Sequence, residues 1–150
     1  MKNLYEPARL EEVKQRMARL QPDSQRQWGK MNAPQMLAHC ATAMEWAVGD
    51  TRPQRMFIGR IIGGMIKSKV VGDDQPIRKN SPTVPVLVIK DDRDLAKERD
   101  RLRALLDRFA SAGPAGCTKH PHSFFGRMTA EEWAILSYKH LDHHLRQFGV

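Results

Sequence analysis

The sequence predicts an all-α protein, because helical periodicity and helix-start signals dominate it. Apolar residues recur at spacings of three, four and three near the N-terminus, at Leu10, Val13, Met17 and Leu20. Residues 31–49 carry a single charge, Glu45, and Asn32 can cap them, so we expect a second helix that is buried on most sides. Thr129 and Glu132 match a capping box and predict the start of a last helix.

The segments between these helices complete the predicted architecture. Residues 52–71 predict a short basic amphipathic helix, weakened by glycine, that packs against the other helices or a second subunit rather than against lipid. The proline-containing residues 72–90 predict an extended loop across the surface. A fourth helical stripe opens at Asp92 and ends in S-A-G-P-A-G at 111–116. Four substantial helices and one weaker helix predict a single bundle domain over residues 1–150.

The composition narrows the class of protein. The formal net charge of +8 and the sequence pI of about 9.9 would permit binding to nucleic acid. Acidic and basic residues are interspersed, however, and no basic segment carries interleaved aromatic residues, so nucleic acid is not an expected partner. The sequence contains no run of about 18 apolar residues, so we expect no membrane span, and the polar N-terminus does not resemble a secretory signal. With only two cysteines, the expected location is the reducing cytoplasm.

Three of the six histidines lie in the last twelve residues, K-H-L-D-H-H-L-R-Q-F-G-V, and a helical wheel separates them. With about 100° per residue, His140 and His144 fall on one edge of the apolar stripe centred on Leu141. Their i, i+4 spacing places both side chains on one side of the helix, where two imidazoles can ligate one metal ion. His143 falls on the opposite face, and we expect it to be exposed to solvent.

His39 supplies a third imidazole, from the second predicted helix. A buried histidine needs partners for its ring nitrogens, and a backbone carbonyl or Gln35 would satisfy it without a metal. Alternatively, His39 joins His140 and His144 in a three-imidazole site with an open coordination position, as catalytic metal sites have. Zinc is the divalent metal expected first at such a site, with nickel or iron as alternatives.

Taken together, these residues resemble a known group. A histidine late in Q-M-L-A-H-C, followed by H-L-D-H-H-L-R-Q on the last helix, resembles the DinB/YfiT-like superfamily of metalloenzymes. More narrowly, W-G-K-M-N-A-P-Q-M-L-A-H-C, H-P-H-S-F-F-G and Y-K-H-L-D-H-H-L-R-Q-F-G resemble an uncharacterised bacterial branch, a domain of unknown function. The resemblance covers nearly the whole chain. It implies an up-down-down-up four-helix bundle, here with an extra short helix and a long proline-containing loop, which is often dimeric.

The resemblance also implies a set of site residues and a chemistry. His39, His140 and His144 would ligate the metal, and the trailing H-x-x-Q of the family maps onto His144 and Gln147, so Gln147 would orient a ligand or contact a substrate. Characterised relatives include thiol-dependent transferases and a thiol-dependent isomerase, in which a metal lowers the pKa of a low-molecular-weight thiol.

We therefore expect a homodimeric, metal-dependent transferase or hydrolase that acts on a small electrophilic molecule. The metal would act as a Lewis acid that activates a thiol or water. The alternative is a non-enzymatic binding or scaffold protein with a basic surface and no functional metal site.

Other residues in the second predicted helix carry less definite signals. Trp46 lies on the same side as His39 and either lines a cofactor or substrate pocket or only packs. Glu45 lies about 120° around the helix from His39, so we do not assign it as a general base. Cys40 is interpreted as a small buried core residue.

The connection before the last helix carries two open interpretations. Cys117 is interpreted as an incidental residue of a flexible loop. His120 and His122 follow it, in H-P-H-S-F-F-G. Phe124 and Phe125 in this stretch either form the apolar wall of a lid over the site or plug the end of the bundle.

Overall fold

The structure is a computed structural model that describes residues 1–150, and all of its regular secondary-structure elements are helices. They are α1 (Pro7–Ala18), α2 (Ala33–Val48), α3 (Phe57–Val71), the 3₁₀ turn η1 (Pro85–Leu87), α4 (Leu95–Gly116) and α5 (Ala130–Gln147). The predicted all-α class is confirmed, with five α-helices and no β-strand. None of the helices combines the length and the hydropathy that a membrane span requires.

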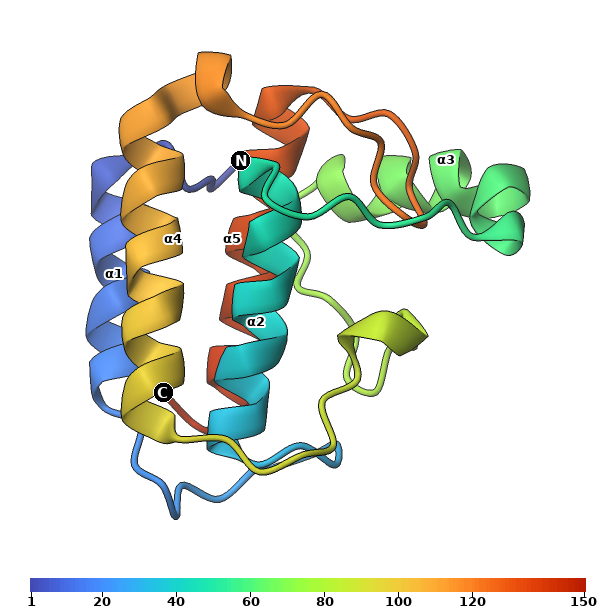
Figure 1. The fold of residues 1–150 in the computed structure, drawn as a ribbon. Helices are drawn as coiled ribbons and strands as arrows, with labels where there is room; N and C mark the ends of the chain where they lie inside the picture. Colours follow the sequence, from blue (N-terminus) through green and yellow to red (C-terminus); the bar gives the residue numbers. More distant parts are fainter.

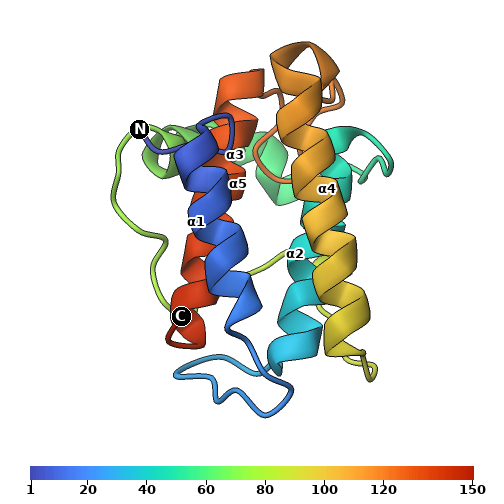
Figure 2. The same cartoon turned by 90° about the vertical axis from the view of Figure 1, so that its left-hand side faces the viewer.

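Four of the helices lie side by side, as Figures 1 and 2 show from two directions. The elements α1 and α5 run one way along the molecule, and α2 and α4 run the other way. The fifth helix, α3, lies outside this group, beside α5 and the connection from α4 to α5 (Figure 1).

The ends of α2 and α5 follow from local sequence. Asn32 accepts a hydrogen bond from the backbone of Gln35, whose side chain accepts one from the backbone of Asn32. Thr129 and Glu132 form the same reciprocal pair at the start of α5. Each pair satisfies two backbone donors that the first helical turn leaves open, so both predicted caps are confirmed.

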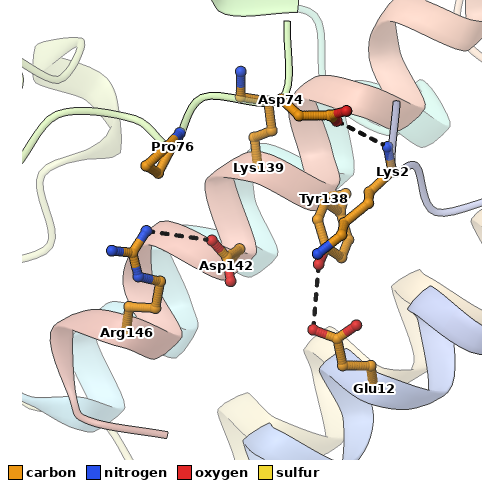
Figure 3. A pocket seen from close by; sticks show the side chains of 8 residues that line it. All are labelled: Lys2, Glu12, Asp74, Pro76, Tyr138, Lys139, Asp142 and Arg146. Carbon is orange, nitrogen blue, oxygen red and sulfur yellow. Dashed lines mark hydrogen bonds and ion pairs between the residues drawn. The ribbon is translucent and has the colours of Figure 1, made fainter.

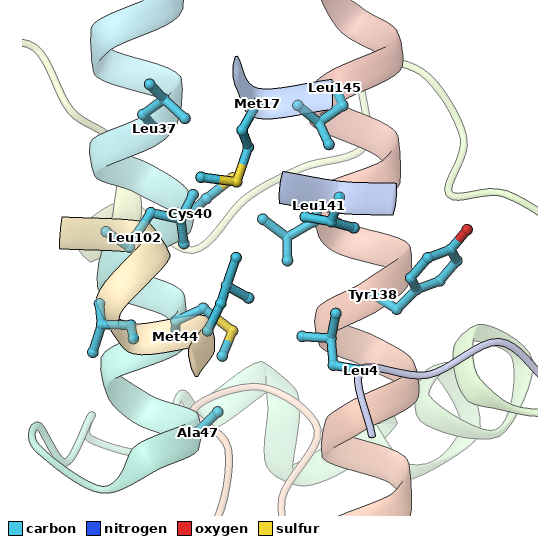
Figure 4. Close-up of a cluster of buried hydrophobic side chains, with 14 of the residues drawn as sticks. Leu4, Met17, Leu37, Cys40, Met44, Ala47, Leu102, Tyr138, Leu141 and Leu145 are labelled. Carbon is cyan, nitrogen blue, oxygen red and sulfur yellow. The ribbon is translucent and has the colours of Figure 1, made fainter. Parts of the chain in front are cut away.

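The apolar core fills the space between the four helices. Its side chains come from all four and from the N-terminal segment, as Figure 4 shows for Leu4, Met17, Leu37, Met44, Leu102, Leu141 and Leu145. Cys40 is fully buried among them, and burial raises the pKa of its thiol. The interpretation of Cys40 as a core residue is therefore confirmed.

The bounds of α4 differ from the prediction at both ends. Asp94, rather than Asp92, caps the helix by accepting from the backbone of Lys97. The helix also continues past residue 111 across a break at Gly113, whose φ of 62° only glycine adopts without strain. This extension carries Cys117 into the core, where it is 8% exposed, so the prediction of an incidental loop residue is wrong.

The segment 72–90 is mostly an exposed loop, as predicted, but it also covers α5. Leu87 is buried against α2, and the carbonyl of Ile77 accepts a hydrogen bond from Nδ1 of His143 at 3.1 Å. His143 is only 8% exposed, and its predicted place in solvent is wrong. A helical wheel marks the side of α5 that faces the other helices, but it cannot indicate that a distant loop folds over the opposite side.

The helix α3 packs by its glycines and leaves its apolar side open. A side chain at Gly63 would overlap the carbonyl of Phe124, so the helix approaches that loop closely. By contrast, Phe57, Ile61 and Met65 are 77%, 64% and 64% exposed. The predicted packing of this helix on the other helices is found, since Val71 packs with Ile135 and Leu136 of α5. Packing of its open apolar side on a second subunit remains an expectation.

Candidate metal centre

The three histidines predicted as metal ligands meet in space. His39 projects from the middle of α2, and His140 and His144 project from α5. One nitrogen from each ring lies within 4.8 Å of the others, and Nε2 of His39 is 2.8 Å from Nε2 of His140. His39 and His144 are buried and His140 is half-buried.

The tautomer of His39 is set by the loop that covers it. Its Nδ1 lies 2.8 Å from the carbonyl oxygen of Leu87, which can only accept a hydrogen bond. The proton is therefore on Nδ1, and Nε2 presents a lone pair to the other two rings. Of the two partners that the sequence left open, the backbone carbonyl is the one found, because Gln35 bonds to Asn32 and to the carbonyl of Asp91.

The tautomer of His144 is set by a longer chain of hydrogen bonds. The amide nitrogen of Gln147 donates to the carbonyl of Trp28 at 2.6 Å, which turns the amide oxygen toward His144. That oxygen accepts from Nδ1 of His144 at 2.8 Å, so Nε2 of His144 also carries a lone pair. Gly29, with φ of 80°, makes room for the amide, because a side chain there would overlap it.

His140 needs only a small change to become the third ligand. With the lone pair of His39 facing it, Nε2 of His140 is the donor of the 2.8 Å hydrogen bond between them. Two nitrogens on a tetrahedral zinc ion lie about 3.3 Å apart, given zinc–nitrogen distances of about 2.0–2.1 Å. A metal therefore fits if His140 holds its proton on Nδ1 and the pair separates by about half an ångström.

The surroundings keep the three rings neutral. Burial and the proximity of His39 lower the pKa of His144 to about 3. Burial, with His144 and His39 close by, also holds the pKa of His140 well below its usual value. The pKa of His39 is lowered by burial, although its bond to the Leu87 carbonyl opposes the shift. Metal ligation requires neutral imidazoles, so at neutral pH no proton has to be displaced from the cluster.

Two residues that the sequence indicated, Gln147 and Trp46, lie at different places. Gln147 is 3% exposed and holds His144 directly, as described above. Trp46 is also buried, but it lies two turns beyond His39 on α2, with its ring 5.5 Å from that of His122. Their roles toward a cofactor or substrate stay predictions.

Nothing in the sequence indicates the roles of the Leu87 and Trp28 carbonyls. Every residue has a carbonyl, so no residue type could mark them. Only the path of the two loops over α2 and α5 brings the Leu87 carbonyl to His39 and the Trp28 carbonyl to Gln147, which bonds to His144.

A second, charged pocket of about 320 Å³ lies on another side of α5. Its charged and polar side chains point toward one another in Figure 3, where Tyr138 donates to Glu12 and Arg146 pairs with Asp142. The backbone of Lys2 donates to Asp74. None of the candidate metal ligands lines this pocket, so it is separate from the three-histidine cluster.

Comparison with known proteins places the chain in a family but not in a characterised one. No curated protein and no solved structure matches it. The link to the DinB/YfiT-like superfamily therefore stays a prediction. One family, described as a protein of unknown function (DUF1569), matches residues 3–149, so the chain belongs to the DUF1569 family.

Proposed function

We propose that this protein binds a divalent metal ion, zinc first, through His39, His140 and His144, and that it is a metal-dependent transferase or hydrolase acting on a small electrophilic substrate. On this proposal the four long helices are the DinB/YfiT-like up-down-down-up bundle, the protein is cytoplasmic, and a low-molecular-weight thiol is the expected cosubstrate. One observation carries it: three neutral imidazoles converge within 4.8 Å.

The hydrogen bonds around the cluster support the proposal. Ring nitrogens of metal-ligating histidines are usually fixed by a carbonyl or carboxylate on the far side. The Leu87 carbonyl does this for His39, and the Gln147 amide does it for His144. These contacts leave the Nε2 lone pairs of His39 and His144 directed at the cluster, where a metal ion would accept them.

The chain's own residues would then divide the work. His39 and His144 are held in place before binding, and His140 is the ligand that adjusts. A bound divalent metal would supply Lewis acidity that makes a thiol or water nucleophilic near neutral pH. The half-buried side of His140 is where a substrate would approach, because the other two rings are covered.

Metal content tests the proposal. Untagged wild-type protein, loaded separately with zinc, nickel and iron and then desalted, should retain about one ion per chain by elemental analysis. His140→Ala should retain much less. His120→Ala removes an imidazole outside the cluster, where it bonds to the carbonyl of Pro53, and should behave as the wild type.

Absence of stoichiometric metal in the wild type under all three conditions would contradict the proposal. It would favour the second candidate function, a binding or scaffold protein, for which the exposed apolar side of α3 is the supporting observation. Salt-sensitive binding to DNA that is unaffected by His140→Ala would point the same way.

The proposed homodimer rests on that side of α3. Phe57, Ile61 and Met65 follow at i, i+4 and i+8 and are largely exposed, as residues at a subunit contact would be in a single chain. Light scattering of the wild type and of Ile61→Lys tests this. A monomeric wild type would contradict the homodimer and leave the metal site unaffected.

A further inference from the structure

The loop before α5 holds the ring of His122 in a fixed place. His122 and Gly126 exchange two backbone hydrogen bonds, of 2.8 and 3.0 Å, that close the loop. The guanidinium of Arg55 donates to three consecutive carbonyls of this loop, beginning with that of His122, at 2.8, 3.2 and 3.0 Å. These bonds hold the backbone of the loop in place at His122.

The same loop decides which nitrogen of His122 carries the proton. The backbone N–H groups of Phe124 and Phe125 both donate to Nδ1, at 3.1 Å each. Because both partners are donors, Nδ1 must be unprotonated, and the proton of the neutral ring lies on Nε2. Burial and the charge of Arg55 lower the pKa of His122 to about 4, so the ring is neutral at pH 7. The Nε2–H group has no acceptor within the chain, because these two bonds are the ring's only ones.

The ring of Trp133, whose own N–H group lacks an acceptor, packs against the ring of His122. The side chain of Trp133 is 3% exposed, and its ring centroid lies 5.4 Å from that of His122. Its buried Nε1 has no hydrogen-bond partner. A buried donor without an acceptor is destabilising and uncommon in native proteins, so it calls for a specific explanation such as a ligand or water.

The charge beside these two donors is positive. All hydrogen bonds of Arg55 go to backbone carbonyls, those of the loop and that of Gly59, and no carboxylate pairs with it. An unpaired guanidinium with two open N–H donors nearby favours an anionic oxygen group over a neutral or cationic one.

This group of side chains lies at a defined place relative to the three histidines. Trp46 is seven residues after His39 on α2, and Trp133 is seven residues before His140 on α5. Seven residues are nearly two helical turns, so each tryptophan lies on the same side of its helix as the histidine, about 10 Å along the axis. The two helices are antiparallel, so both tryptophans are displaced toward the same end, where His122 contacts both rings.

We propose that His122 and Trp133 form a binding site for a carboxylate group, and that this carboxylate belongs to the substrate whose reacting end lies at the three-histidine cluster. The second half of this statement rests on the proposed function, whereas carboxylate binding does not. His122 Nε2–H and Trp133 Nε1–H donate to the carboxylate, and Arg55 holds the loop and supplies positive charge. Phe125 stacks on the ring of His122, and Trp46 meets that ring edge to face.

Carboxylate binding is tested in the metal-free protein by ¹H–¹⁵N NMR of the tryptophan indole groups. Hexanoate is the probe and 1-hexanol is the uncharged control. Hexanoate should shift the indole signal of Trp133, which Trp133→Phe identifies by its loss, and 1-hexanol should not.

The role of His122 is tested with His122→Asn. The asparagine oxygen can still accept from the two backbone N–H groups, but no donor remains at the position of Nε2. Its affinity for hexanoate should fall about tenfold, as expected for one hydrogen bond to a charged group. His120→Asn, whose ring bonds only to the Pro53 carbonyl, should leave the affinity unchanged. No shift of the Trp133 signal in either metal-free or zinc-loaded protein, or equal affinity in His122→Asn, would overturn the proposal.

The link to the cluster is tested with 6-mercaptohexanoate, which carries a thiol and a carboxylate at its two ends. Zinc-loaded protein should bind it at least about tenfold more tightly than hexanoate, and His122→Asn should weaken both probes alike. If zinc gives no gain while hexanoate still binds, the carboxylate site stands and its connection to the cluster is wrong. If the wild type takes up no metal, the proposed function fails independently, and the hexanoate result still decides the carboxylate site.

Discussion

The two sides of α5 lie in different environments, although the residues compared, His140 and Leu141, are neighbours in the sequence. Leu141 is 2% exposed and lies in the apolar core between the helices (Figure 4). His140, the preceding residue, lies in a polar cluster that is covered by loops and bonded to His39. Successive residues of a helix are rotated by about 100°, and this rotation alone places Leu141 in the apolar core and His140 in the polar cluster.

The difference teaches how the two environments are built. On the core side the helices pack on one another, and the apolar side chains there need close packing but no hydrogen-bond partners. The histidine side is closed by single residues from distant loops: the Leu87 carbonyl holds the ring of His39, and the Trp28 carbonyl holds Gln147, which in turn holds the ring of His144. We therefore expect substitutions on the first side to change stability, and substitutions on the second to change ligand binding.

The largest expected effect separates these two neighbours in the metal-free protein. Leu141→Ala should lower the free energy of unfolding by about 3 kcal/mol, because it removes buried methyl groups and leaves a cavity. His140→Ala should lower it by only about 1 kcal/mol, the cost of its hydrogen bond to His39. Urea denaturation at pH 7 measures both. Equal losses would mean that the cluster is an ordinary part of the core.

The second expected effect is the stability gained on zinc binding, for which His140→Ala should be the more damaging of the two variants. At a free zinc concentration about 100 times the dissociation constant, the wild type should gain about 2.7 kcal/mol of stability. Leu141→Ala should keep most of this gain, and His140→Ala should lose it. Thermal unfolding with zinc and then with excess chelator measures the shift. A zinc response that is unchanged in His140→Ala would place the metal elsewhere on the chain.

The sequence predicted the parts of the molecule that depend on residue type and spacing. The caps at Asn32 and Thr129 follow from local hydrogen bonding, and both are present. Helical geometry predicts that His39, His140 and His144 turn toward the same interior, and the three rings do meet. In each case the determining contacts lie within one helix or between two adjacent ones.

The parts that the sequence could not indicate depend on where loops travel. His143 was expected in solvent, but the segment that contains Ile77 covers it. The isolated Nε2–H of His122 depends on two backbone amides that only the folded loop directs at its ring. Periodicity describes one helix at a time, so contacts made by the backbone of a remote loop leave no mark in it.

A smaller effect is expected from Gln147, which connects the carbonyl of Trp28 to the ring of His144. Gln147→Leu removes the acceptor for Nδ1 of His144 and the donor to Trp28, so the ring is no longer held with its lone pair on the cluster. Zinc affinity should fall about 10- to 100-fold. Competition with a coloured chelator measures the affinity, and Gln15→Leu on the exposed side of α1 is the matched control. An affinity equal to that of the control would show that Gln147 does not orient His144.

The smallest effect concerns the neutrality of the cluster in the metal-free protein. The pKa of His144 is about 3 in the folded chain and about 6.5 when unfolded, so between these values the unfolded state binds the extra proton. His144 therefore does not lower stability above pH 6.5, and it lowers the free energy of unfolding by about 1.4 kcal/mol for each unit that the pH falls below that value. Between pH 6 and 4.5, the free energy of unfolding of His144→Leu should therefore fall less steeply than that of the wild type, by about 1.4 kcal/mol per pH unit. Urea denaturation at several pH values measures both slopes. Carboxylates with lowered pKa, such as Glu12 and Glu132, titrate in both proteins and cancel in the difference. Parallel curves would mean that the pKa of His144 is not lowered in the folded protein, which would contradict a buried ring that stays neutral below pH 6.5.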